Sequence, residues 1–428
     1  MNRRVRFLDT RPLRRSRPFR DLWIGTSASQ LGGQIATVAV LAQVWDLTGS
    51  TVGTGAIGLA TGLSMVLFGL LGGTLADSVD RRALVRATTA GQLLVAAGLS
   101  VQAVAGDRNV VLLLALVAAG TACGALGAPA RRTFPVRLLP ADQVAAGLAL
   151  TNVSFQAAML AGPALAGLII ARWDLPAAYG AQAATTVVSV LAVIRLPAMK
   201  PEGAGTNFTR RRPERGGWRI VLRRPTLWGS MATDLSATLL AMPIALFPLV
   251  NEIRFGGNPQ TLGLFLSAVA VGGITAGLLS GTVTRWRRGG LVQLCAAAVW
   301  GLALAGFGLS GPLWPALGCL AVAGAADTVS VVTRSALVQL ETPDAYRGRV
   351  SSLEHVIGVA GPELGNFRGG LMASATSAPF ALVTGGLSAT LAVAAVAATN
   401  ASLRAYRTPP TPDEPTAPET VDAATVTG

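Results

Sequence analysis

The sequence predicts an all-α integral membrane protein with twelve transmembrane helices, arranged as two parallel six-helix repeats. Three observations predict this fold class. The chain carries little charge, its apolar residues fall into runs long enough to cross a bilayer, and motifs of the first half recur in the second half. Together they indicate a helical bundle whose outer surface faces lipid rather than water.

Composition separates this chain from soluble proteins of its size. Of its 428 residues, 13% are charged and 51% are hydrophobic, and the mean hydropathy is +0.52. Soluble domains carry about 25% charged residues, so most of this surface is expected to face lipid. The three cysteines lie in separate apolar runs and there is a single histidine, which argues against a disulfide framework and against a metal site.

Twelve apolar runs are long enough to span the membrane, since a spanning helix needs about 20 residues. Six lie near residues 22–45, 52–75, 84–105, 110–129, 143–171 and 175–196. Six more lie near residues 226–250, 260–283, 290–310, 312–333, 350–372 and 379–403. They divide the chain into a basic cytoplasmic N-terminus (1–21), an N-terminal six-helix bundle (22–196), a cytoplasmic linker (197–225), a C-terminal six-helix bundle (226–403) and a tail expected to be disordered (404–428).

The basic residues predict which side of the membrane each loop occupies. With the N-terminus inside, thirty-one Lys and Arg residues fall on the cytoplasmic side, and Arg108, Arg172 and Arg254 fall on the other. This asymmetry follows the positive-inside rule and places both termini in the cytoplasm. It also accounts for the net charge of +14, so the sequence argues against a nucleic-acid partner.

Short motifs recur in the same order in the two halves. The matching sets are Gly69, Gly73 and Thr74 with Gly277, Gly281 and Thr282, and Gly162-Pro163 with Gly361-Pro362. Such matches indicate a duplicated six-helix unit in parallel orientation, an architecture of transporters that bind substrate between the repeats. Glycines four residues apart in these motifs are expected to let neighbouring helices pack closely.

The turn after the second predicted span has the sequence Gly73-Thr74-Leu75-Ala76-Asp77-Ser78-Val79-Asp80-Arg81-Arg82. It resembles the signature loop between helices 2 and 3 of the major facilitator superfamily. The resemblance implies a conformational latch formed by Gly73, Asp77, Arg81 and Arg82. In such a latch the Asp docks against the start of a helix in the other half, where the helix dipole stabilises a carboxylate. Arg81 and Arg82 also fit a purely topological role.

Five further segments extend this resemblance. They are Ala130-Arg131-Arg132-Thr133-Phe134-Pro135, Gly162-Pro163-Ala164-Leu165-Ala166-Gly167, Asp234 with residues 242–248, residues 326–330 with Arg334, and Pro362-Glu363-Leu364-Gly365-Asn366-Phe367-Arg368-Gly369-Gly370. These segments are similar to those of the enterobactin-exporter-like, drug:proton antiporter subfamily. Over residues 18–400 the resemblance implies alternating-access export of a small amphiphilic compound, a drug or a siderophore, driven by inward proton flow. It also implies a multi-pass protein of the inner (cytoplasmic) membrane, and we expect a monomer.

Two positions depart from the family pattern. Gly33 follows Leu31-Gly32 where such proteins often carry an acid, and Thr284 stands where the second copy of the latch loop would have one. These departures leave open a non-transporting membrane sensor. An importer of a small solute on the same fold is the other alternative, because sequence does not set the direction of transport.

Ionisable residues inside predicted spans are expected to have a partner or to face a cavity, since an isolated charge there costs several kcal/mol. Asp234 and Asp327 are the proton-coupling candidates, with a static hydrogen-bonded carboxylate as the alternative for each. The candidates for interior charge pairing or substrate binding are Glu354, Glu363, Arg368 and Arg334. Glu363 and Arg368 are expected to pair with each other or across helices.

Prolines inside spans predict kinks, because proline lacks an N–H and frees a backbone carbonyl. The expected kink and packing positions are Gly162, Pro163, Pro243, Pro248, Gly361 and Pro362.

Motifs for catalysis are missing from the sequence. There is no Walker loop, the only lysine is Lys200, and neither an H-E-x-x-H helix nor a G-x-S-x-G elbow occurs. We therefore expect a transporter rather than an enzyme, with no cofactor and no metal. Its expected partners are a small-molecule substrate, protons and the lipid bilayer.

Overall fold

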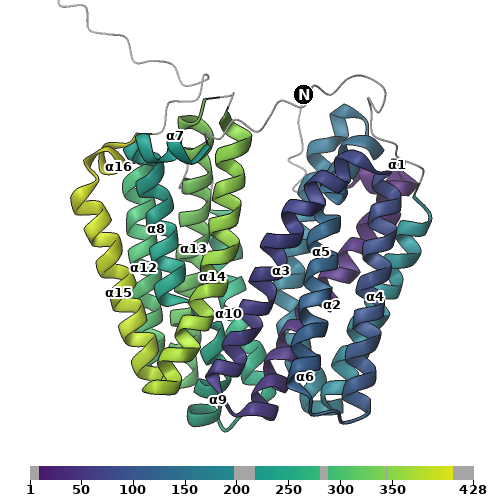
Figure 1. Cartoon of the computed structure of the whole chain (residues 1–428), viewed down its shortest axis with the longest axis horizontal. Coiled ribbons are helices and arrows are strands. Elements are labelled where there is room, and N and C mark those ends of the chain that lie inside the picture. Colours follow the sequence, from purple (N-terminus) through teal and green to yellow (C-terminus); the bar gives the residue numbers. More distant parts are fainter. Residues whose placement is uncertain (1–8, 197–216, 280–287, 344–345, 408–428) are drawn as a thin grey trace, which may run out of the picture.

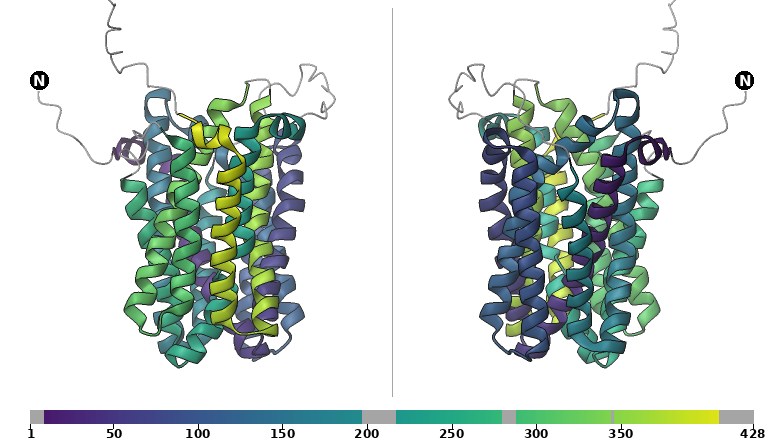
Figure 2. Two further views of the ribbon diagram at one scale, coloured as in Figure 1. Left: turned by 90° about the vertical axis from the view of Figure 1, so that its left-hand side faces the viewer. Right: turned by 90° about the vertical axis from the view of Figure 1, so that its right-hand side faces the viewer.

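The computed structural model describes residues 9–196, 217–279, 288–343 and 346–407, and all regular elements within these ranges are helices. The long helices run roughly side by side as two groups, α2 to α6 and α8 to α15 (Figure 1). The views from either side show the same upright bundle (Figure 2). The all-α prediction is confirmed.

The first group begins with a short helix and continues with five long ones. Their bounds are α1 Arg11–Arg15, α2 Arg17–Thr48, α3 Thr51–Ser78, α4 Arg81–Val104, α5 Val110–Leu138 and α6 Ala141–Ile194. Four of the long helices start after a residue whose side chain accepts a hydrogen bond from the first turn, namely Ser16, Ser50, Asp80 and Asn109. Such caps satisfy backbone donors that the helix itself leaves free.

Helix α6 contains two of the predicted spans. Its 54 residues would extend about 80 Å as one straight helix, far beyond the ~30 Å hydrocarbon core, but Asp174 breaks it with φ 65° and ψ 179°. The break separates the two runs predicted near 143–171 and 175–196. One non-helical residue therefore serves as the connection between these spans.

The second group is less regular than the sequence predicts. Its elements are α7 Gly217–Arg223, α8 Pro225–Ala241, the 3₁₀ helix η1 Ile244–Leu246, α9 Phe247–Phe255, α10 Pro259–Leu278, α12 Gly289–Leu309, α13 Leu313–Glu341, α14 Arg347–Ala375, α15 Ala378–Thr399 and α16 Ala401–Ala405. The span predicted over 226–250 is confirmed as part of one apolar segment, Pro225–Phe255, and it is interrupted at a predicted kink position: the chain leaves the helix after Ala241 and resumes it in α9. Pro243 lies in this interruption and Pro248 in the first turn of α9.

Nine of the described helical segments are long and apolar enough to cross a membrane. By that criterion the predicted number of twelve is not confirmed. One of the nine is the double-length segment in α6, and the helices of the first and eleventh predicted spans, α2 and α14, are not among them. Both of these helices line the internal cavity described below, so they can carry polar side chains shielded from lipid.

The two groups touch mainly through two helix pairs, α3 with α14 and α6 with α10, and less extensively where α3 meets η1 and where α2 meets α9 and α10. Thr51 Oγ1 donates to Gly370 O at 2.7 Å, and Thr54 Oγ1 donates to Ala245 O at 2.7 Å. Ser267 Oγ donates to Leu160 O at 2.9 Å in the other pair. Toward the end that carries the described termini, α3 and α14 diverge (Figure 1). The direct contacts between the groups are thus concentrated at the opposite end.

Candidate functional site

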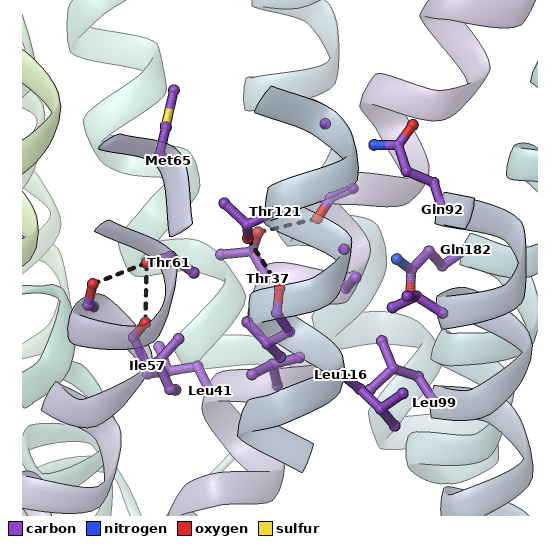
Figure 3. Close-up of a pocket in the computed structure, with 18 of the residues that line it drawn as sticks. Thr37, Leu41, Ile57, Thr61, Met65, Gln92, Leu99, Leu116, Thr121 and Gln182 are labelled. Carbon is purple, nitrogen blue, oxygen red and sulfur yellow. Dashed lines mark hydrogen bonds between the residues drawn. The ribbon is translucent and has the colours of Figure 1, made fainter. Parts of the chain in front are cut away.

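A cavity of about 510 Å³ lies mainly within the first group of helices (Figure 3). Helices α2, α3, α4, α5 and α6 supply most of its lining. Apolar side chains alternate with uncharged polar ones, which are Ser29, Thr37, Thr54, Thr61, Thr121, Thr186, Gln92, Gln182 and Asn366. A cavity of this size and mixed lining suits a drug-sized organic molecule.

The second group closes one side of the cavity with residues of η1 and α14. Ile244, Ala245, Glu363 and Asn366 contribute to the lining. Asn366 Oδ1 accepts a hydrogen bond from Ala245 N at 3.2 Å, so the break in the seventh span and helix α14 are joined at this wall. The interruption near Pro243 therefore places backbone groups of the second group of helices against the cavity in the first group.

Glu363 is the one ionisable side chain among the described residues that line the cavity. It lies against α3, where a Cβ added to Gly58 would come within 2.8 Å of Glu363 Oε2. The Thr61 and Asn366 side chains lie near enough to interact with its carboxyl group. Gly58 on α3 thus leaves space for the Glu363 carboxylate of the second group to line the cavity in the first group.

The departure at Gly33 also falls on the cavity. Gly33 lines it, and a Cβ added there would meet no atom of the described residues within 4 Å. The wall therefore has room for a side chain at the position where the family resemblance led us to expect an acid, and glycine leaves it uncharged. The other departure, Thr284, lies outside the described residues.

Three predicted charges meet inside the second group, between α8, α13 and α14. Arg334 donates to Asp234 Oδ2, and both side chains are 7% exposed. Arg334 Nε also lies 3.6 Å from Glu354 Oε1, which accepts a hydrogen bond from Ser335 Oγ at 3.0 Å. The topological count grouped Arg334 with the cytoplasmic charges, whereas its position beside a span also made it a candidate interior charge. The structure agrees with the second interpretation, because α13 continues to Glu341 and buries this arginine.

Asp327 belongs to the same charged region. It lies on α13 two helical turns before Arg334, near enough to interact electrostatically with Asp234 and Arg334. The region therefore contains three carboxyl groups and one guanidinium. Such an excess of acids in a poorly solvated interior is stable only if some carboxyls are protonated or reached by water.

Arg368 does not join this region. It donates to Leu240 O on α8 and lies 3.7 Å from Met372 Sδ. The expected pair with Glu363 is not formed; Arg368 supports the carbonyl near the end of α8, and Glu363 faces α3. Arg368 thus stabilises the interruption of the seventh span rather than the cavity.

The remaining kink positions lie in continuous helices, where helices approach each other closely. A Cβ on Gly162 would lie 2.4 Å from Gln34 Cβ of α2, and a Cβ on Gly361 would lie 2.5 Å from Thr238 Oγ1 of α8. Pro163 and Pro362 each follow such a glycine inside α6 and α14. The two repeats therefore use Gly-Pro at equivalent packing positions.

The predicted latch is described only in part. Gly73 and Asp77 lie on α3, but their side-chain surroundings lie outside the described part of the chain. Arg81 opens α4, where Asp80 Oδ1 accepts a hydrogen bond from Arg82 N at 2.8 Å. Arg82 Nη2 donates to Ile194 O at 3.4 Å, which caps the C-terminal end of α6. The latch itself stays a prediction.

Sequence reasoning missed the polar residues of the cavity. Gln92 and Gln182 interrupt apolar runs of the third and sixth spans, and this interruption was a usable signal, since polar side chains in spans commonly face a cavity. The sequence-based prediction also placed Arg131 in a loop. In the structure, α5 extends to Leu138 and Arg131 hydrogen-bonds to Gln92.

Comparison with known proteins agrees with this architecture. The family described as transmembrane secretion effector matches residues 10–425. The enterobactin exporter EntS of Citrobacter koseri is 27% identical over 391 residues, which cover 90% of this chain and 92% of the relative. The EntS of Shigella boydii serotype 18 is 26% identical over the same shares.

Among solved structures, a mutant of the nucleoside transporter NupG superposes with a TM-score of 0.73 at 13% identity, covering 89% of this chain and 99% of that one. This similarity establishes the major facilitator fold, and the relatives support a transporter rather than an enzyme. The chain is a multi-pass membrane transporter that belongs to the transmembrane secretion effector family of the major facilitator superfamily.

Proposed function

We propose that this protein exports a small amphiphilic compound, a siderophore or a drug, across the cytoplasmic membrane by alternating access in exchange for protons. The observation that carries the proposal is the cavity of about 510 Å³, which lies mainly within the first group of helices and is lined on one side by residues of the second group. The relatives named enterobactin exporter favour a siderophore as the compound. A single chain holds both the cavity and the charged region, so a monomer suffices.

The orientation follows from the positive-inside rule. The end with the termini carries Arg81, Arg224 and Arg404, so it is assigned to the cytoplasm. The contacts between Thr51 and Gly370 and between Thr54 and Ala245 then close the opposite, external end. In this state an exporter would take up its substrate from the cytoplasmic side.

Proton coupling is assigned to Asp234 and Asp327. Arg334 can neutralise one carboxylate of the region, and the remaining acids gain from a proton when water is excluded. When water reaches them in the alternate state, the proton is released. The charged region lies in the second group and the cavity mainly in the first, so substrate and proton use different halves, with Glu363 of the second half in the cavity wall.

The test is transport by the full-length protein in proteoliposomes, with metal-free enterobactin as the probe and a pH gradient that can be imposed in either direction. We expect D234N and D327N to abolish proton-driven accumulation while enterobactin still equilibrates along its own gradient. D107N is the matched control, because Asp107 is exposed in the loop between α4 and α5, where its side chain accepts a hydrogen bond from Asn109 N. It should transport as the wild type does.

Three results would contradict parts of this proposal. Full proton-driven transport by both D234N and D327N would exclude these acids as the coupling groups. Uptake only toward the cytoplasmic side would indicate an importer. Cells that lack the gene could retain added dyes but no chelator in iron-poor medium. That result would identify the exported compound as a drug rather than a siderophore.

A further inference from the structure

The amide of Gln92 has a fixed orientation at the cavity wall. Gln92 Oε1 accepts a hydrogen bond from Arg131 Nη2 at 3.1 Å. A guanidinium offers donors only, so the amide must present its oxygen to Arg131. Its Nε2 then faces the other way, and Figure 3 shows this nitrogen directed into the pocket. A Cβ added to Gly124, another lining residue, would lie 3.2 Å from Nε2.

Arg131 carries a charge that no acid neutralises among the described residues. In the part of the chain that the structure describes, its one hydrogen bond goes to Gln92, and its Nε is buried without a partner. A cation bonded to the amide oxygen draws electron density from the amide and makes the N–H groups on the far side stronger donors. Arg131 therefore acts on the cavity through Gln92.

The second amide of the cavity, Gln182, lacks such an anchor. Its Oε1 is buried without a hydrogen-bond partner, and no charged side chain of the described chain is bonded to it. Gln182 can present either end of its amide to a ligand, whereas Gln92 presents only a donor. Within the described chain, Gln92 Nε2 makes no hydrogen bond and is left available to the cavity contents.

We propose that Gln92, positioned by Arg131, determines specificity by donating a hydrogen bond to an acceptor oxygen of the exported compound. This inference rests on the proposed function and narrows its substrate class. The compound bears phenol, carbonyl or carboxylate oxygens at the end near Gln92, and donor groups can face Glu363 on the wall supplied by α14. Catechol groups fit this polarity because each hydroxyl both accepts and donates.

The test measures equilibrium binding to the purified full-length protein by quenching of its tryptophan fluorescence. Metal-free enterobactin is the oxygen-rich probe and ethidium is the cationic probe. Q92E keeps an acceptor for Arg131 but removes the donor and adds a negative charge. We expect its Kd for enterobactin to rise about tenfold, the factor that 1.4 kcal/mol represents, and its Kd for ethidium to fall. Opposite shifts cannot result from partial unfolding.

Two further variants complete the design. R131M frees the Gln92 amide and should raise the Kd for enterobactin less than Q92E does. Q260E, the same substitution at an exposed position of α10 outside the cavity, should change neither Kd. Equal Kd values in Q92E and Q260E, or shifts of both probes in the same direction, would overturn the inference. Binding with these shifts but without transport in proteoliposomes would instead overturn the proposed function alone.

Discussion

At the scale of single residues, Arg334 determines the charge balance of the second group of helices. It bonds to Asp234 on α8 and lies 3.6 Å from Glu354 on α14, so one guanidinium joins three helices. A buried ion pair contributes little net stability compared with apolar packing, but removing one partner leaves an uncompensated charge. We therefore expect the arginine to stabilise the fold as well as to take part in the proposed proton exchange.

We expect R334M to destabilise the protein by about 3–5 kcal/mol, the usual cost of breaking a buried pair. Thermal unfolding of the purified protein in detergent measures the effect. The double variant R334M/D234N should recover part of the loss, because it also removes the carboxylate left unpaired. An unchanged unfolding temperature in R334M would show that water reaches Asp234 freely.

Sequence predicted which residues of this region are unusual but not how they are combined. Asp234, Asp327 and Glu354 were identified because acids in apolar runs are costly. Arg131 was placed in a loop, and Arg334, although named as a candidate interior charge, was counted with the cytoplasmic residues, since each lies near the cytoplasmic end of its run. Helices α13 and α5 continue past them. Pairing across helices depends on packing, which periodicity in one sequence does not specify.

At the scale of helices, α10 and α13 approach so closely that glycine is required on both. A Cβ on Gly272 would lie 1.7 Å from Ala321 O, and a Cβ on Gly324 would lie 1.9 Å from Val269 O. Both clashes are with backbone, which cannot move aside as a flexible side chain can. The contact fixes the two helices against each other within the second group.

G272A should therefore lower the free energy of unfolding by about 1–3 kcal/mol, the typical cost of overpacking. G277A on the same helix is the matched control, because a Cβ on Gly277 would meet no described atom within 4 Å, and it should change stability by less than about 0.5 kcal/mol. Chemical or thermal unfolding in detergent compares the two. Equal stability of both variants would mean that α10 and α13 separate readily at this point.

The helices themselves were largely predictable, because long apolar runs and capping residues mark where they begin and end. The seventh span was predictable only in part, because Pro243 and Pro248 indicate a kink but do not specify where the helix stops. Its run is continuous in hydropathy, and the break after Ala241 is stabilised by groups far along the chain, through Arg368 bonding to Leu240 O and Asn366 bonding to Ala245 N. Interactions of this kind become visible only once α14 has been placed beside α8.

At the scale of the whole molecule, alternating access requires the open end to close. The repeat-related glycines Gly69 on α3 and Gly277 on α10 were expected to pack against neighbouring helices. In this state that expectation is wrong for both, since a Cβ at either position would meet no atom of the described residues within 4 Å. Gly58, further along α3 toward the closed end, is already in contact with Glu363. Gly69 and Gly277 thus lie on helices that contact the other group of helices only nearer the closed end of the molecule.

We expect the double variant G69L/G277L to fold and to bind substrate as the wild type does, because the present state has room for both side chains. Its transport rate should fall at least about tenfold, since the added side chains would keep the two halves apart at the open end and so hinder closure, a barrier increase of about 1.4 kcal/mol. Enterobactin binding in detergent and efflux from proteoliposomes, measured on the same preparation, separate the two effects. G58L, which places its side chain against Glu363, should instead lower stability. A double variant that transports at the wild-type rate would show that these helix faces never meet, and closure would have to proceed by a different movement of the two halves.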